Sequence, residues 1–138
     1  MQTKITLGYL GFLPFAMLTI LPWIFGETYE EVSFKLLVVY GGIIISFLSG
    51  IIWGIDTTNQ KNLVLAIIFS LLGFGAILLA WIDLIYAMTL LFFLFFLFYL
   101  LEAKINPQFT NPDYLKLRKN LTSGVCGCYM FSIVILIY

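Results

Sequence analysis

The sequence predicts an all-α, polytopic membrane protein: one transmembrane domain of 138 residues with five transmembrane helices. Hydrophobic residues make up 62% of the chain and the mean hydropathy is +1.08. A soluble protein of this composition would have too few polar residues to cover its own surface. The seven Lys/Arg and seven Asp/Glu residues fall mainly between uncharged stretches. These stretches are about 20 residues long, the length that a helix needs to cross the hydrocarbon core.

The first expected span covers residues 5–25, and its two prolines predict a kink and a frayed end. It is longer than the apolar region of a cleaved signal peptide, so we expect the segment to be retained. A short acidic loop, residues 27–31, leads into the second span at residues 32–55. The polar segment 56–62 then offers several cap-forming residues for the next helix, so the chain is expected to reverse there.

Residues 63–101 contain a single charge, Asp83. As one helix they would be about 58 Å long, which exceeds the thickness of any bilayer. The chain must therefore reverse near the middle. Trp81 can lie at the membrane interface and Asp83 can cap a following helix, so we place the turn there. The third and fourth spans are then residues 63–81 and 84–101.

The fifth span is expected at residues 118–138. Asn111, Pro112 and Asp113 form a helix start, with an N-cap residue, a proline in the first turn and an acid next to it. The first turns of this helix should lie at the level of the lipid headgroups before the chain enters the membrane.

Orientation follows from the distribution of basic residues. With five spans, one side of the membrane carries a single basic residue, Lys35, and the other carries six. Cytoplasmic segments are enriched in Lys and Arg, so the amino terminus is expected inside, in the cytoplasm, and the carboxyl terminus outside. The six residues are Lys4, Lys61, Lys104, Lys116, Arg118 and Lys119.

Several classes of function are disfavoured. The chain has no histidine, which removes a common ligand for metals and haem and the usual general base near neutral pH. Cys126 and Cys128 point to different sides of a helix and cannot hold one ion together. Phosphate-binding loops and nucleophile elbows are missing, and zero net charge argues against nucleic-acid binding. We expect no catalytic residue, metal or cofactor.

The second span contains a ridge of small residues at every fourth position, formed by Gly42, Ser46, Gly50 and Gly54. This spacing lets another helix backbone approach closely. We expect it to be a helix-packing face toward the first or fifth span, so that these three helices form the centre of the bundle. The alternatives are a seam between two copies, a docking groove for another protein, or a cleft for a lipid or quinone tail.

Four residues of the second span and its end, Tyr40, Ser49, Trp53 and Asp56, could line a polar groove for a ligand or partner. Ordinary packing, interface and capping roles are the alternative for each of them.

A basic cluster, Lys116, Arg118 and Lys119, could contact anionic lipid headgroups or simply set the topology. No charged residue lies deep in an expected span, which disfavours a pump or a coupled transporter.

Three stretches of the chain resemble the transmembrane protein 69 family, an uncharacterised family of bacteria and mitochondria. They are Gly8 to Phe15, Tyr40-Gly41 leading to Ser46 through Gly54, and Tyr114 with Leu117-Arg118 and Leu121-Thr122. The resemblance would extend over almost the whole chain. Family members often have His before the motif tryptophan, where this chain has Ile52. The resemblance implies a small inner-membrane protein with several spans and no established activity.

We expect a non-catalytic protein that serves as an accessory or assembly subunit of a larger inner-membrane complex, in contact with lipids and with a protein partner or a second copy. The alternative is a binding or transport module for a lipid, quinone or small amphiphile, with a groove lined by the second span. A lipid-modifying enzyme would need polar groups clustered at one depth, and the sequence indicates none.

Overall fold

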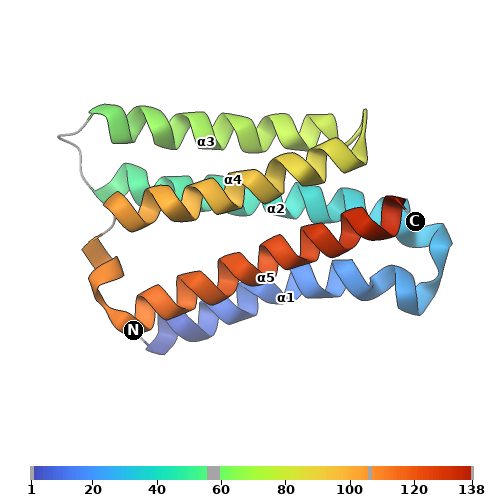
Figure 1. The fold of residues 1–138 in the computed structure, drawn as a ribbon, viewed down its shortest axis with the longest axis horizontal. Coiled ribbons are helices and arrows are strands. Elements are labelled where there is room, and N and C mark those ends of the chain that lie inside the picture. Colours follow the sequence, from blue (N-terminus) through green and yellow to red (C-terminus); the bar gives the residue numbers. More distant parts are fainter. Residues whose placement is uncertain (1, 56–59, 106, 138) are drawn as a thin grey trace.

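The computed structural model describes residues 2–55, 60–105 and 107–137, and their regular secondary structure is entirely helical. Five of the helices in these ranges are long and apolar enough to cross a membrane, as the sequence predicts. They lie side by side along one direction (Figure 1). In chain order the elements are α1 (Gln2–Phe25), the 3-10 helix η1 (Glu27–Tyr29), α2 (Glu30–Ile55), α3 (Gln60–Leu79), α4 (Leu84–Ile105), the 3-10 helix η2 (Pro107–Thr110) and α5 (Pro112–Ile137).

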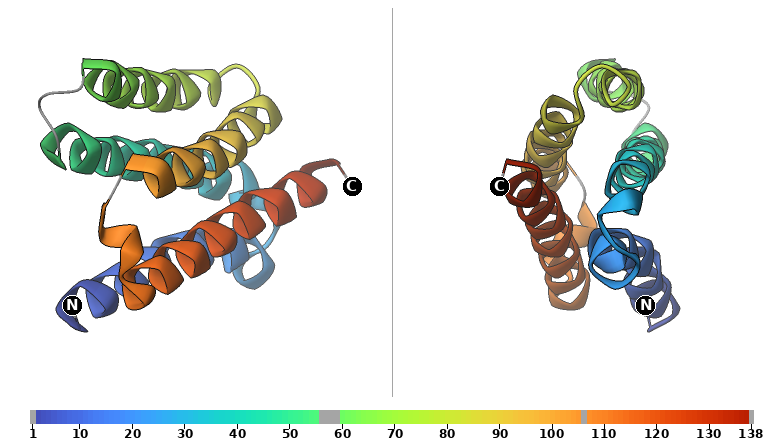
Figure 2. Two further views of the ribbon diagram at one scale, coloured as in Figure 1. Left: turned by 60° about the vertical axis from the view of Figure 1, so that its left-hand side comes forward. Right: turned by 90° about the vertical axis from the view of Figure 1, so that its right-hand side faces the viewer.

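The five helices form a ring in chain order, which the end-on view of Figure 2 shows. Neighbours in sequence pack together, α1 also packs against α5, and α2 contacts α4 across the ring. The start of α1 and the end of α5 lie at opposite ends of the bundle (Figure 1). This arrangement is the one that an odd number of antiparallel spans requires.

The most extensive helix pair is α2 with α3, followed by α4 with α5. The expected centre of the first, second and fifth spans is therefore only partly right, because α1 packs against both α2 and α5 but α2 packs mainly against α3. Helix α5 reaches α2 mainly through one long side chain: the Tyr129 hydroxyl donates a hydrogen bond to the carbonyl oxygen of Leu37 at 3.0 Å. A tyrosine side chain is long enough to reach across a gap between two helix backbones. Helix α2 therefore packs against α1, α3 and α4 and is joined to α5 by the Tyr129 hydrogen bond.

Aromatic side chains fill the space enclosed by the five helices. Phe15 packs against Tyr40, Phe95 and Tyr129, with ring centroids 4.9, 5.9 and 6.1 Å away. Large apolar side chains also cover the outside of every long helix. A bundle with apolar residues both inside and outside fits lipid as its solvent, because hydrocarbon does not penalise their exposure.

The chain reverses between α3 and α4 at residues 80–83, the segment that the sequence indicates. The Asp83 carboxylate accepts hydrogen bonds from the backbone N–H groups of Ile85 at 3.0 Å and Tyr86 at 3.3 Å, and so caps α4. At the other end α4 runs to Ile105, beyond the expected end at residue 101, and this extension carries Glu102 into the helix.

Candidate functional site

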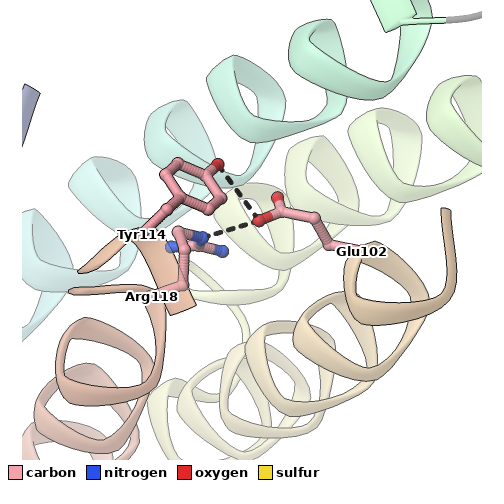
Figure 3. A network of polar contacts seen from close by, with 3 residues as sticks. All are labelled: Glu102, Tyr114 and Arg118. Atoms are coloured by element: carbon pink, nitrogen blue, oxygen red, sulfur yellow. Dashed lines mark hydrogen bonds and ion pairs between the residues drawn. The ribbon is translucent and has the colours of Figure 1, made fainter. Parts of the chain in front are cut away.

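A buried ion pair links α4 to α5. The Arg118 Nε donates a hydrogen bond to Glu102 Oε1 at 2.8 Å, and the Tyr114 hydroxyl donates to the same oxygen at 3.4 Å (Figure 3). The side chains of Glu102 and Arg118 are 0% and 8% exposed. Ionisable residues inside membrane helices are rare and mark functional sites by default, so this pair defines where a site should be sought.

Local helix geometry explains how the three residues meet. Tyr114 and Arg118 are four residues apart on α5, and this spacing places them on one face of the helix. Glu102 lies on the buried face of α4, at helical spacing from Leu91, Phe95 and Phe98. Both faces point into the α4–α5 contact, where the two charges neutralise each other.

Sequence reasoning missed this pair. It ended the fourth span at residue 101, just before Glu102, and gave contact with lipid headgroups or control of the topology as the role of Arg118. The available signal was the position of Glu102, four residues after Phe98 on a continuing helical face. Because the fourth span is apolar on every side, its sequence does not distinguish the buried face from the lipid-facing one.

A cavity of about 150 Å³ lies next to Arg118, between α1, α2, α4 and α5. Its walls are almost entirely apolar, and Arg118 and Thr122 are the polar side chains that line it. The apolar lining includes Gly11, Phe12, Phe15, Leu48, Phe95 and Val125. An apolar cavity of about 150 Å³ holds a benzene ring in an engineered protein, so this one can accept a ring or a short length of alkyl chain.

Glycine creates part of this space. A Cβ added to Gly11 would meet no atom within 4 Å, so its missing side chain leaves room. Leu7 and Phe47 also line the cavity and are 61% and 69% exposed. The cavity therefore reaches the outer surface of the bundle beside α1 and α2, where an amphiphile could arrive from the bilayer.

The polar groups of the cavity have unused hydrogen-bonding capacity. Thr122 is 7% exposed, and its Oγ1 has no hydrogen-bond partner among the described residues. Leaving such a buried group unpaired costs about 1–3 kcal/mol. Within the same ranges, Arg118 uses only its Nε toward protein, in the bond to Glu102. Hydrogen-bond donors therefore face an apolar space that can hold a ligand.

The described residues among those predicted to line a groove along the second span do not line this cavity. The Tyr40 hydroxyl donates to the carbonyl oxygen of Gly11 at 2.8 Å, beside the new cavity. The buried Ser49 donates to the backbone of its own helix, and Trp53 is 51% exposed. Neither Ser49 nor Trp53 lines the cavity, and Asp56 lies outside the described residues. A groove around these residues stays a prediction.

The small-residue ridge of α2 divides into two halves. A Cβ on Gly42 would lie 2.5 Å from Ile77 Cδ1 and 3.0 Å from the Gly73 carbonyl oxygen, both on α3. Ser46 accepts a hydrogen bond from Ser70 of α3 at 3.3 Å. This half packs on the third helix rather than on the first or fifth. Gly50 and Gly54 would place a Cβ in open space, so their half of the ridge faces no helix of this chain.

The basic cluster is also divided. Arg118 is buried with Glu102, whereas Lys116 and Lys119 are exposed. Cys126 and Cys128 are free thiols, and no group of three or more potential metal ligands occurs among residues 2–55, 60–105 and 107–137.

The five long apolar helices place the protein in the class of multi-pass helical membrane proteins. The family described as "Protein of unknown function (DUF3429)" matches residues 1–134, and the chain belongs to this family. Searches of curated proteins and of solved structures gave no match.

Proposed function

We propose that this protein is a non-catalytic membrane protein that binds a neutral amphiphile in the cavity between α1, α2, α4 and α5. The observation that carries the proposal is the unpaired Thr122 hydroxyl beside Arg118, in a cavity that is otherwise apolar. Binding sites for small molecules are typically apolar with a few polar groups that fix orientation. The cavity has this composition and opens toward lipid at Leu7 and Phe47.

Charge selects the class of ligand. Glu102 neutralises Arg118 at 2.8 Å, and Arg118 is the only ionisable side chain that lines the described cavity. An anionic headgroup would bring an uncompensated charge into an apolar space, which is strongly unfavourable. A carbonyl oxygen instead can accept hydrogen bonds from Thr122 and from the guanidinium without adding charge. The ligand is therefore an ester-linked or quinone-type amphiphile with an uncharged head.

Binding of three probes to the purified protein in mild detergent tests this proposal: monoolein, decylubiquinone and the anion oleate. Native mass spectrometry counts the bound probe. The wild type should retain a neutral probe, and the retention that depends on Gly11 should be greater for the neutral probes than for oleate. Gly11→Leu fills the cavity without removing a polar group and should abolish retention.

Gly127→Leu is the matched control, because Gly127 also has open space at its Cβ and does not line the cavity. It should bind the neutral probe like the wild type. Equal retention of the neutral probes by the Gly11 and Gly127 variants would overturn the proposal.

A second candidate is an accessory or assembly subunit of a larger membrane complex. The open space beside Gly50 and Gly54 favours it, since a helix of another subunit can pack closely there. Purification from native membranes in mild detergent tests this candidate. A stoichiometric partner should copurify with the wild type and be lost from Gly50→Leu/Gly54→Leu. A protein that purifies alone contradicts it.

We infer further that the protein resembles the transmembrane protein 69 family within its broader family and that it resides in the inner membrane. The sequence motifs support the first inference. The same resemblance supports the second, and the excess of basic residues on one side of the five spans supports a cytoplasmic amino terminus.

A further inference from the structure

A second cavity, of about 270 Å³, lies between α4 and α5. We refer to it as the α4–α5 groove. Aromatic residues of α4 line one side, and smaller or polar residues of α5 line the other. Phe96 is 48% exposed, and Lys119 and Ser123 are exposed as well, so the groove is accessible from the lipid phase. The lining includes Phe92, Phe96, Tyr99, Lys119, Ser123 and Cys126.

The groove has a polar end and an apolar end. Cys126 Sγ lies 3.7 Å from the Phe92 carbonyl oxygen, which fixes the register of the two antiparallel helices. Seven residues along each helix, or about 10 Å, bring Tyr99 level with Lys119. A tyrosine and a lysine therefore mark one end of the groove, and phenylalanine side chains line the rest. Tyrosine and lysine are typical of the membrane interface, where headgroups lie.

The polar end carries excess positive charge. Lys119 makes no ion pair with a described residue, and Lys104 and Lys116 are exposed near the same end of the bundle. Arg118 and Glu102 cancel each other, which leaves Asp113 as the acid closest in sequence to these lysines. An anionic headgroup gains from this field, whereas a zwitterionic one gains much less.

We propose that the α4–α5 groove binds an anionic phospholipid. Its phosphate lies at Lys119 and Ser123, and one acyl chain packs over Phe96 and Phe92. The site is independent of the neutral amphiphile proposed above. Thr122 lines both cavities, but its single hydroxyl proton serves only one acceptor. Lys119 and Ser123 belong to the groove alone.

Native mass spectrometry with phosphatidylglycerol and phosphatidylcholine of the same acyl chains tests the proposal. The wild type should retain phosphatidylglycerol preferentially. Lys119→Gln should reduce this preference by about fivefold, the effect of one lysine near a membrane surface. Lys116→Gln is the matched control. Lys116 lies three residues before Lys119 and carries the same charge, but its side chain does not line the groove. This variant should keep most of the preference.

Phe96→Ala separates the acyl chain from the headgroup. Phe96 is half exposed, so its truncation should not disturb folding. It should lower the retention of both phospholipids while preserving the ratio between them. If Lys119→Gln and Lys116→Gln reduced the preference for phosphatidylglycerol equally, the lipid would be attracted by the surface charge alone. This result would overturn the proposed site. Equal retention of the two lipids by the wild type would overturn it as well.

Discussion

Glu102 Oε1 and Arg118 Nε lie 2.8 Å apart, and both side chains are buried. The two residues come from different helices, α4 and α5, so their contact connects the spans at one level of the bundle. The attraction between buried charges is opposed by their loss of hydration, and replacement of a whole pair by apolar residues is often neutral. Loss of one partner alone is different, because a charge then stays buried without compensation.

The first prediction concerns this asymmetry. Glu102→Leu or Arg118→Met alone should lower the free energy of unfolding by about 3–5 kcal/mol. The double variant should recover most of that loss. Equilibrium unfolding in detergent measures the cycle. Glu31→Gln in the Glu31–Lys35 pair is the control with little expected effect, because the Glu31 side chain is 74% exposed. Additive losses in the double variant would contradict this account.

The second prediction concerns Thr122, whose buried hydroxyl lacks a partner. Valine has nearly the same shape, so Thr122→Val removes an unpaired polar group without leaving a hole. The ligand-free protein should unfold at the same or a higher temperature. Binding of the neutral amphiphile should weaken by about fivefold, the equivalent of one hydrogen bond near 1 kcal/mol. Thermal unfolding with and without decylubiquinone gives both values.

Ser132→Ala is the matched control for this substitution, because it removes a buried hydroxyl without adding volume. Ser132 is fully buried on the same helix and its Oγ is also unpaired, but it does not line the cavity. Its effect on ligand binding should be absent. A Thr122 variant that loses stability while keeping its affinity would show that the hydroxyl serves packing alone.

The third prediction compares two glycines of the ridge on α2. Gly42→Ala forces a methyl group to within 3.0 Å of the Gly73 backbone carbonyl oxygen, which cannot move aside easily. It should separate α2 from α3 and lower the unfolding temperature. Gly50→Ala places the same methyl in open space and should be neutral or stabilising by up to about 1 kcal/mol, because alanine favours helix. Similar effects in the two variants would contradict the packing described for the ridge.

The features that the sequence predicts well depend on length and local chemistry. Five apolar stretches predict five membrane helices, and an aspartate in a run too long for one span predicts the reversal that Asp83 caps. These signals need no knowledge of neighbouring helices. The spacing of Gly42 and Ser46 likewise predicts a packing face, although it does not identify α3 as the partner.

The candidate site was not predictable in the same way, because it depends on which helix faces meet. Glu102 reads as the first residue of a polar loop until α4 is seen to continue to Ile105. Arg118 reads as one of three exposed basic residues until α5 turns it toward Glu102. The cavity beside them comes from the mutual placement of four helices and the absence of a side chain at Gly11, which no local pattern encodes.

The fourth prediction concerns orientation in the membrane. The start of α1 and the end of α5 lie at opposite ends of the bundle (Figure 1), so reporters fused to the two termini should appear on opposite sides. Basic residues are retained on the cytoplasmic side, and six of the seven belong to the side where α1 begins. Alkaline phosphatase fused to the carboxyl terminus should therefore be active outside the cytoplasm, and a fluorescent protein at the amino terminus should fold inside it.

Charge variants test whether the basic residues set this orientation. Replacement of Lys61, Lys104, Lys116 and Lys119 by Gln leaves the Glu102–Arg118 pair intact and removes most of the bias, so a mixed orientation should appear. Lys35→Gln is the control and should leave the orientation uniform, since it removes the single basic residue of the other side. Inactive alkaline phosphatase at the carboxyl terminus of the wild type would reverse the assignment. Two termini on one side would contradict the bundle itself.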